Sequence, residues 1–443
     1  MRTKNMLGIC ALVVAQFYLP GIAYSQAPSL SRWETWLAQN THAMHDDFAQ
    51  LSDADLAPFG AATKGAQLVM LDEQSHGEEN VFALKSRLVR YLHEQHGFDV
   101  LVMESGMYDV DYLWHLNQRD LSGNLDKNLG GNLGGNLGGN LGENLGGRLR
   151  SNASNALFFQ YAKSPAILNL LDYLDTQRNS HHPLQLAGMD SMHTAYYSQQ
   201  HLVNDLYAQL KKLGTTAQIE AAWPMFTTIS NQILHLQRTP PTPLEMKAYL
   251  AVTMQLQKQF ATPEHYFWRR LAASLQFEAT RLWGLAHEQR SPAMGENLKT
   301  LLQTAFKGKK VIVWGNFVHL NRTGLGQGSN VGSLLNSMYK ERMYVVHFTS
   351  NQGSYYNFFN EQNTPVVRFP FKTIENALER QAGPINFTNW RDLPRALSKD
   401  RTIQASLFFY LPDGLYDQAN LKSLWQNRID GSFFLNKITT TNP

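Results

Sequence analysis

Cysteine is almost absent from this chain, and its scarcity excludes several kinds of chemistry. Cys10 is the only cysteine among 443 residues, and it lies in an apolar stretch at the N-terminus. With a single thiol the chain can form no internal disulfide. Once that stretch is removed, the chain also lacks a cysteine nucleophile and a cysteine metal ligand. We therefore expect neither thiol catalysis nor a thiolate metal centre.

Other signatures of common enzyme classes are also missing. The sequence has no P-loop, no dinucleotide-binding glycine fingerprint and no H-E-x-x-H zinc helix. It has no G-x-S-x-G nucleophile elbow, which argues against a serine-hydrolase mechanism. The formal charge of +3 is small and dispersed, so no nucleic-acid partner is expected. Beyond the N-terminus no run is long and apolar enough to span a bilayer.

The N-terminus has the features of an export signal. Arg2 and Lys4 precede the apolar run MLGICALVVAQFYLPGIA, and small residues stand three and one positions before Gln26. We interpret residues 1–25 as a secretory signal peptide. Its removal would leave a periplasmic protein of charge 3 − 2 = +1, without stable membrane insertion. An uncleaved membrane anchor is the alternative, and the Pro-Gly pair near the end of the run favours cleavage.

Apolar strands alternate with amphipathic helices in the first part of the chain. A helix is predicted over 29–48 and a buried strand at Gln67–Met70. Helical spacing of apolar residues then leads to a glycine C-cap at Gly97, and a second buried strand follows at Asp99–Met103. Such a pattern is typical of a parallel sheet covered on both faces. We predict an α/β fold with a mostly parallel central sheet flanked by helices.

The rest of the chain continues this pattern with one long interruption. Helices are predicted at 153–177 and around 330–340, and strands at 184–188, 309–316, 344–348, 366–369, 405–411 and 432–435. Residues 195–307 contain long helical stretches punctuated by proline. We therefore predict one α/β core, made of residues 26–194 and 308–443, with residues 195–307 as an inserted helical subdomain.

A low-complexity insertion lies within the first part of this core. Residues 122–149 repeat Gly, Asn and Leu with a leucine at every fourth position. This period would align the leucines on a helix, but each glycine costs a helix roughly 1 kcal/mol relative to alanine. We predict a mobile insertion that is dispensable for folding. A short flap or a partner-binding segment is the alternative.

Polar side chains follow four of the predicted apolar strands, at the point where each strand ends. Because the ends of parallel strands lie along one edge of the sheet, residues far apart in sequence can meet there in one cleft. Carboxylates beside histidines suit general acid–base chemistry and a metal site equally well. In order along the chain these residues are Glu73 and His76, Glu104, Asp190, and Asn316 with His319.

The same residues stand in a set of motifs that resembles the erythromycin esterase family. The motifs are DEQSHG at 72–77, VLVMES at 100–105, GMD at 188–190 and VIVWGNFVH at 311–319. The downstream segments VGSLLNSMYKERMYVVHFTSNQGSY and IDGSFFLNKITTT match in the same order. The resemblance covers nearly all of the chain after residue 25 except the Gly-Asn-Leu insertion.

The resemblance implies an α/β core with inserted helices that hydrolyses an ester or lactone with an activated water. It places the catalytic histidine at His76, its partner glutamate at Glu73 and a second histidine at His319. It implies a small-molecule ester or lactone, of macrolide type or other, as the partner. No cofactor is expected, although a divalent metal stays possible on this donor set. The sequence leaves the oligomeric state open.

Two departures from the family pattern concern substrate recognition. Asn316 replaces the first histidine of the H-N-x-H motif, and Lys85 stands where the family often has an arginine. A lysine cannot make the planar two-pronged contact of a guanidinium. We assign Asp190, Asn316 and Lys85 to substrate binding and Glu104 to the catalytic set.

A mechanism follows from the pair at the start of the motif. His76 titrates near neutral pH and can accept a proton from water. Glu73 would favour the charged imidazole, so we expect a pKa for His76 above the ordinary value of about 6.5. Two alternatives stay open. One is a metal-dependent hydrolase on the same residues, and the other is a non-catalytic periplasmic binding or envelope protein, which the Asn316 departure keeps open.

Overall fold

The computed structural model describes residues 28–48, 52–121, 148–285, 290–324, 328–366, 368, 373–400, 405 and 425–441. The predicted signal peptide at 1–25 and residues 122–147 of the insertion lie outside these ranges. An eight-stranded sheet forms the centre of the molecule, in the order β1-β9-β10-β6-β2-β5-β3-β4. Its strands are β1 (Thr41–Met44), β2 (Leu68–Leu71), β3 (Val100–Gly106), β4 (Gln185–Asp190), β5 (Val311–Trp314), β6 (Met343–Thr349), β9 (Ile385–Asn389) and β10 (Gly431–Leu435).

The predicted fold class is confirmed, because most of this sheet is parallel. The six neighbouring strands from β10 to β4 pair in parallel, and only the pairings of β9 with β10 and β1 are antiparallel. Every residue of β2, β3, β5 and β6 is buried. This explains why these strands are continuous apolar runs rather than alternating patterns: helices cover both faces of the sheet.

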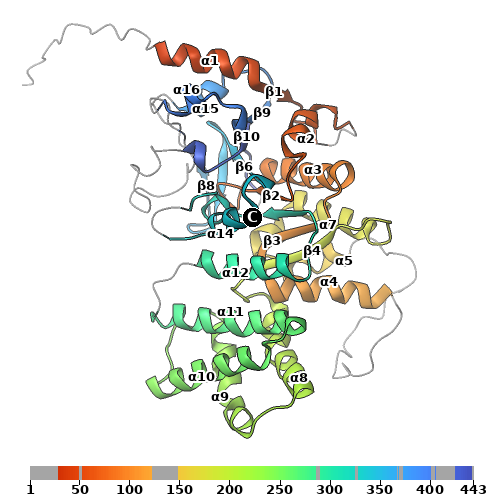
Figure 1. The fold of residues 1–443 in the computed structure, drawn as a ribbon, viewed down its shortest axis with the longest axis vertical. Coiled ribbons are helices and arrows are strands. Elements are labelled where there is room, and N and C mark those ends of the chain that lie inside the picture. The colour runs from red at the N-terminus through yellow and green to blue at the C-terminus, as the bar shows by residue number, and fades with distance from the viewer. Residues whose placement is uncertain are drawn as a thin grey trace, which may run out of the picture.

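Helices from the first part of the chain and from its end flank the sheet (Figure 1). Gly97 has φ +64° and ends α3 in a left-handed C-cap, as predicted. The flanking helices are α1 (Pro28–Asn40), α2 (Ala57–Thr63), α3 (Glu79–His96), α4 (Met107–Leu121), α5 (Arg148–Ser151), α6 (Phe159–Lys163), α7 (Pro165–Gln177), α12 (Arg290–Gln303), α13 (Phe317–Leu320), α14 (Val331–Tyr339), α15 (Ile374–Leu378) and α16 (Arg395–Ser398).

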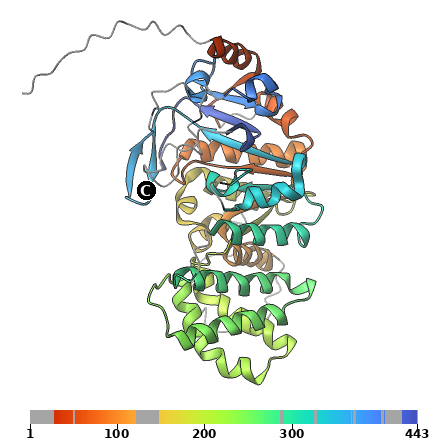
Figure 2. The ribbon, with the colours of Figure 1, turned by 60° about the vertical axis from the view of Figure 1, so that its left-hand side comes forward.

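Four further helices lie together at the end of the molecule opposite α1 (Figures 1 and 2). They pack mainly against one another, and α12 lies between them and the sheet, in contact with α11, α14 and β4. The four are α8 (Val203–Leu213), α9 (Ala217–Leu234), α10 (Pro243–Gln259) and α11 (Tyr266–Leu282). A π-helix at Ser198–Leu202 leads into α8. The division of the chain into a core and an inserted subdomain stays a prediction.

Several predicted boundaries need correction. The helix expected over 29–48 ends at Asn40, and the following residues form β1, because the edge of β9 offers backbone partners from Thr388 to Ile385. Of the strand predicted at 366–369, residues 366 and 368 are described and lie in no strand, whereas β8 (Gln362–Pro365) pairs with β7 (Ser354–Asn357) in a separate hairpin. The strand β9 was not predicted. Most of the strand predicted at 405–411 lies outside the described residues.

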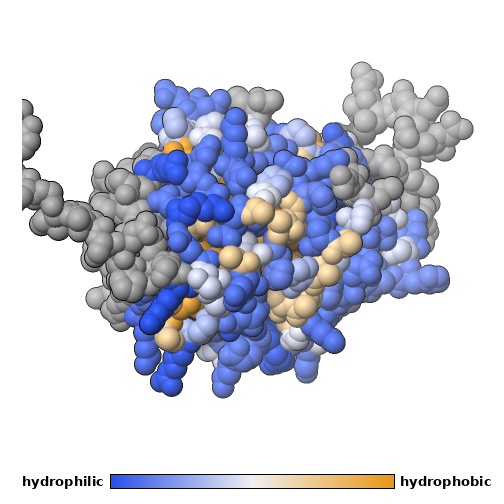
Figure 3. Space-filling model, turned by 90° about the horizontal axis from the view of Figure 1, so that it is seen from above, coloured by the Kyte–Doolittle hydropathy of each residue, from blue (hydrophilic) through white to orange (hydrophobic). Residues whose placement is uncertain are grey.

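The face that Figure 1 shows at the top is mostly hydrophilic, with apolar side chains in small groups (Figure 3). Among the described residues, no helix combines the length and the apolar character that crossing a membrane requires.

The last leucine of the repeat sets a boundary for the insertion. Leu149 lies in α5 and is fully buried in the core, where α5 packs against α7. The predicted dispensable segment therefore cannot extend to residue 149. We expect replacement of residues 122–147 by a short Gly-Ser linker to leave the thermal unfolding midpoint nearly unchanged. Leu149→Ala should instead lower the free energy of unfolding by about 2–5 kcal/mol. A clear fall in the midpoint with the linker would show that the repeat contributes to the packed structure.

Candidate active site

The loop between β2 and α3 is held by backbone hydrogen bonds from residues that lie much later in the chain. The Gly77 carbonyl accepts hydrogen bonds from the backbone N–H groups of Tyr356 (3.0 Å) and Thr441 (3.2 Å). A Cβ on Gly77 would lie 2.1 Å from the Tyr356 carbonyl oxygen. Glycine is thus required by the close approach of β7, and this approach fixes His76 just before it.

The four strands that carry the predicted site residues are neighbours in the sheet. They lie in the order β2-β5-β3-β4, and all are parallel. Glu104 lies within β3, where the pairing with β4 becomes irregular, and Asp190 is the last residue of β4. His319 lies on the short helix α13. The prediction that Glu73, His76, Glu104 and His319 converge is confirmed by the ion-pair distances between them.

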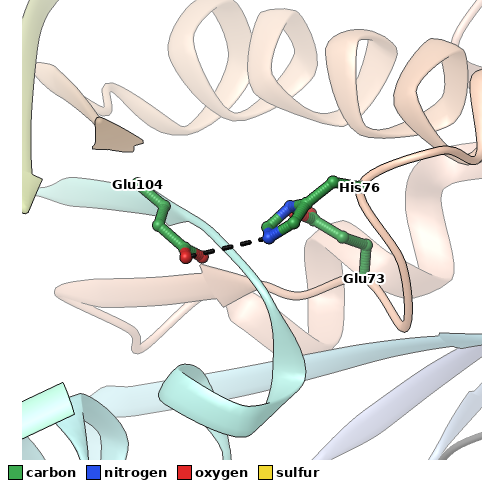
Figure 4. A group of neighbouring side chains, drawn as sticks. All are labelled: Glu73, His76 and Glu104. Carbon is green, nitrogen blue, oxygen red and sulfur yellow. Dashed lines mark hydrogen bonds and ion pairs between the residues drawn. The ribbon is translucent and has the colours of Figure 1, made fainter. Parts of the chain in front are cut away.

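His76 is held by Glu73 on one side and faces Glu104 on the other (Figure 4). Its Nδ1 lies 3.1 Å from Glu73 Oε1 and its Nε2 lies 3.8 Å from Glu104 Oε1. Glu73 is fully buried. It also accepts a hydrogen bond from the Tyr161 hydroxyl (2.5 Å) and forms an ion pair with Lys85. A carboxylate surrounded by donors acts as an acceptor, so Nδ1 carries the proton and Nε2 keeps its lone pair.

Glu104 is the point where the positive and titratable groups of the site meet. Its Oε1 lies 3.2 Å from His319 Nε2 and pairs with Arg290, while its Oε2 accepts the backbone N–H of Asn316 (2.7 Å). Burial alone raises the pKa of Glu104, but His319, His76 and Arg290 together bring that pKa well below its ordinary value. Glu104 is therefore ionised at neutral pH.

Arg290 is a residue of the site that the sequence did not reveal. It opens α12 and pairs with Glu104 and with Asp190, whose Oδ1 lies 3.3 Å from its Nε. Its Nη1 contacts the sulfur of Met192 at 3.5 Å, which is a weak acceptor. The Arg290 side chain is 28% exposed. A strong, partly accessible donor thus stands beside both carboxylates.

The predicted direction of the His76 pKa shift is wrong. The pKa of His76 is lowered from its ordinary value, chiefly because burial disfavours the charged ring. Glu104 and Asp190 act against this effect, whereas Arg290 adds to it. The His76 side chain is 11% exposed, and this burial outweighs the acidic neighbours. His76 is neutral at pH 7 and able to accept a proton.

Two residues assigned to substrate binding have other contacts. Lys85 is fully buried behind Glu73, and its Nζ lies 4.1 Å from the centroid of the Trp314 ring. Burial lowers the pKa of Lys85 well below its ordinary value. Asn316 is buried, caps α13 through Val318 N–H (3.0 Å) and donates to the Gln74 carbonyl (3.1 Å). Both side chains support the loop between β2 and α3 through these contacts, and their assignment to substrate binding stays a prediction.

Asp190 keeps a position at the edge of the site. It is buried, its Oδ1 accepts the Met192 N–H at 3.0 Å, and it pairs with Arg290. Burial raises the pKa of Asp190, and Arg290 opposes that shift. Its contacts orient the arginine, and contact with a substrate stays a prediction.

The site also contains a donor set that could hold a metal ion. One ligand atom each from Glu73, His76 and Glu104 lies within 4.8 Å of the others. Glu73 already forms an ion pair with Lys85, and Glu104 forms one with Arg290. A divalent ion would have to compete with two cations for these carboxylates, which makes the geometry better suited to acid–base chemistry than to metal binding.

Comparison with known proteins places the chain in a family. The family model for erythromycin esterase matches residues 93–438. The chain therefore belongs to the erythromycin esterase family. The matched range contains Glu104, Asp190 and His319, whereas Glu73 and His76 precede it. Family membership supports a hydrolase.

Individual proteins are similar to this chain in sequence or in fold. A Bacillus subtilis (strain 168) protein named "Putative hydrolase YbfO" is 23% identical over 413 residues, which cover 82% of this chain and 85% of that protein. The crystal structure of a succinoglycan biosynthesis protein has a TM-score of 0.69 at 15% identity, covering 93% of this chain and 98% of its own. A mutant of erythromycin esterase EreC in its open conformation has a TM-score of 0.62 at 14% identity, covering 91% and 98%.

Proposed function

We propose that this protein is an exported hydrolase that cleaves a carboxylic ester or lactone with a water molecule activated by His76. The observation that carries the proposal is the orientation of the two ring nitrogens of His76. Its Nδ1 faces a buried carboxylate at 3.1 Å and its Nε2 faces the site beyond hydrogen-bond distance of Glu104, at 3.8 Å. This is the arrangement of a general base with an orienting partner. Export to the periplasm rests on the sequence of residues 1–25.

His76 and one water molecule account for every proton moved and every bond made or broken in this hydrolysis. His76 Nε2 takes a proton from water as the water oxygen bonds to the substrate carbonyl carbon, and the carbonyl electron pair moves onto its oxygen. When this intermediate collapses, the bond to the alkoxy oxygen breaks, and the alkoxy oxygen takes the proton back from the imidazolium. A carboxylic acid and an alcohol result. A lactone yields one hydroxy acid instead.

Arg290 is the best-placed group to stabilise the oxyanion. It carries a positive charge that pairs with Glu104 and Asp190, and its Nη1 contacts the thioether sulfur of Met192. Donors that meet charge developing in the transition state typically contribute a factor of about 10²–10³ in kcat. His319 lies between Ser291 Oγ (2.5 Å from its Nδ1) and Glu104 (3.2 Å from its Nε2), so it helps to position that carboxylate.

The proposal is tested by incubating the purified protein with short acyl esters, simple lactones and macrolides. Mass spectrometry should show a mass gain of one water in at least one of them. We expect EDTA to leave the rate unchanged, since both carboxylates already have cationic partners. If EDTA abolished turnover and a divalent ion restored it, the metal-dependent alternative would replace this proposal. If no ester, lactone or macrolide reacted, the non-catalytic alternative would stand.

Arg290 should also control how kcat/KM for hydrolysis depends on pH. Its charge lowers the pKa of His76, so the arginine keeps the base neutral in mildly acidic solution. We expect the acid limb of kcat/KM to lie below about pH 6.5, the ordinary histidine value. In Arg290→Gln the limb should move to higher pH, because a nearby cation no longer opposes protonation, and kcat should fall by about 10²-fold.

The measurement is kcat/KM across the range in which histidine titrates, for wild type and for two arginine variants. The control is Arg150→Gln, which breaks an exposed pair with Asp172 (2.7 Å) outside the site. This variant should change neither kcat nor the pH at which the acid limb of kcat/KM lies. An unshifted limb in Arg290→Gln would show that Arg290 does not act on His76.

A further inference from the structure

Two Phe-Phe pairs, 200 residues apart in sequence, meet beside His76. The first pair, Phe158-Phe159, stands at the start of α6, and the second, Phe358-Phe359, lies in the turn of the β7–β8 hairpin. This hairpin projects from the side of the molecule in Figure 2. Neither pair belongs to the motifs or to the acid–base groups described above.

The first phenylalanine of each pair contacts the catalytic ring. The centroid of His76 lies 4.8 Å from that of Phe158 and 5.7 Å from that of Phe358. Phe158 is tied to the site through its backbone, because its N–H donates to Ser105 Oγ (2.9 Å), next to Glu104. These two rings therefore form an apolar wall beside the base.

The second phenylalanine of each pair extends this wall to the surface. Phe159 is 48% exposed and Phe359 is 78% exposed. The ring centroids are 4.7 Å apart in the first pair and 4.2 Å in the second, and Phe159 lies 6.0 Å from Phe358. The four rings are thus one continuous apolar surface from solvent to His76.

We propose that this aromatic collar, formed by Phe158, Phe159, Phe358 and Phe359, binds the apolar acyl or alkoxy group of the ester. This inference rests on the proposed hydrolase function and names its substrate class. Single exposed apolar side chains are common on protein surfaces and need no explanation. Rings from two distant segments that join at a catalytic base are different, because substrate pockets are typically lined by aromatic side chains with few polar groups.

A substrate in the collar would place its carbonyl beside His76. Its apolar end would cover Phe159 and Phe359, and removing these rings from water would add binding energy in proportion to the area covered. The collar therefore selects esters with a longer apolar chain over methyl esters, and it does so without contributing to the proton transfer.

The test compares methyl, butyl, hexyl and octyl acetates with wild type and with the double variant Phe159→Ser/Phe359→Ser. In wild type, kcat/KM should rise roughly threefold for each added methylene over the first few. In the double variant the ratio of hexyl to methyl acetate should fall by about tenfold or more. The control is Leu244→Ser, an equally drastic change at a 79% exposed leucine of α10, and it should keep the wild-type ratio.

A binding measurement separates this inference from the proposed function. N-octylacetamide, an unreactive analogue of octyl acetate, should bind wild type more tightly than N-ethylacetamide by calorimetry, and the double variant should lose that difference. This result without hydrolysis of any ester would support the collar and overturn the hydrolase proposal. Hydrolysis with an unchanged chain-length ratio in the double variant would overturn the collar alone. A changed sedimentation coefficient with an unchanged ratio would also overturn it and identify a contact between copies.

Discussion

His76→Ala should lower kcat/KM for any ester that the protein hydrolyses by about 10²-fold or more. Removal of the imidazole leaves no base at the position where Nε2 faces the site. A positioned base typically contributes a factor of about 10²–10⁴. Glu104 does not replace it, because His319 and Arg290 keep the pKa of that carboxylate well below the ordinary value. So weak a base cannot deprotonate water at neutral pH.

The matched control is His235→Ala, at an exposed histidine that follows α9 and contacts the Asn231 carbonyl (2.7 Å). This variant should hydrolyse the same ester at the wild-type rate. Circular dichroism and the thermal midpoint of both variants show whether folding is intact. Full activity in a folded His76→Ala variant would remove the histidine from the mechanism.

Lys85→Met should destabilise the protein strongly, by about 3–5 kcal/mol. Lys85 and Glu73 are both 0% exposed and form an ion pair. Breaking a buried pair by removing one partner leaves an uncompensated charge in the interior. In this variant Glu73 would keep the Tyr161 hydroxyl and His76 as donors but lose its positively charged partner. The shift in the urea unfolding midpoint measures the loss.

A double-mutant cycle isolates the pair from the packing of the lysine stem. Lys85→Met/Glu73→Gln should recover much of the stability lost in Lys85→Met, because no unpaired charge stays buried. Lys211→Met, which breaks an exposed pair with Glu220, should leave the midpoint nearly unchanged, since surface pairs contribute little. If the losses in the two single variants at positions 85 and 73 simply added, the two residues would not act as a pair.

The central strands could be predicted from sequence because of where they lie. The strands β2, β3, β5 and β6 are buried on both faces, so their residues form apolar runs that need no partner information to be recognised. In contrast, β9 reads INFTN, with polar residues between its apolar ones. It belongs to the sheet because it pairs with β10 and β1, a long-range contact that no local pattern encodes.

The site was predictable to the extent that strand ends reveal it. Glu73, His76, Glu104 and His319 follow or end apolar runs, and parallel topology brings such residues to one edge. Arg290 follows no strand and lies 186 residues from Glu104 in sequence, so its role required the packing of α12 against the sheet. The direction of the His76 pKa shift was predicted wrongly for a related reason. A loop residue is normally solvated, and its burial by Phe158, Tyr161 and Phe358 is a tertiary effect.

The most direct test of water activation by His76 is a single turnover in heavy-oxygen water, with enzyme in excess over an ester that the panel has identified. Mass spectrometry of the products and of the digested enzyme then locates the label. Direct attack by water predicts one labelled oxygen in the acid product, none in the alcohol and none in the peptides that contain Glu73 or Glu104. Label in either glutamate peptide would contradict the account, because it would mean that a carboxylate attacked the substrate and water only released the product.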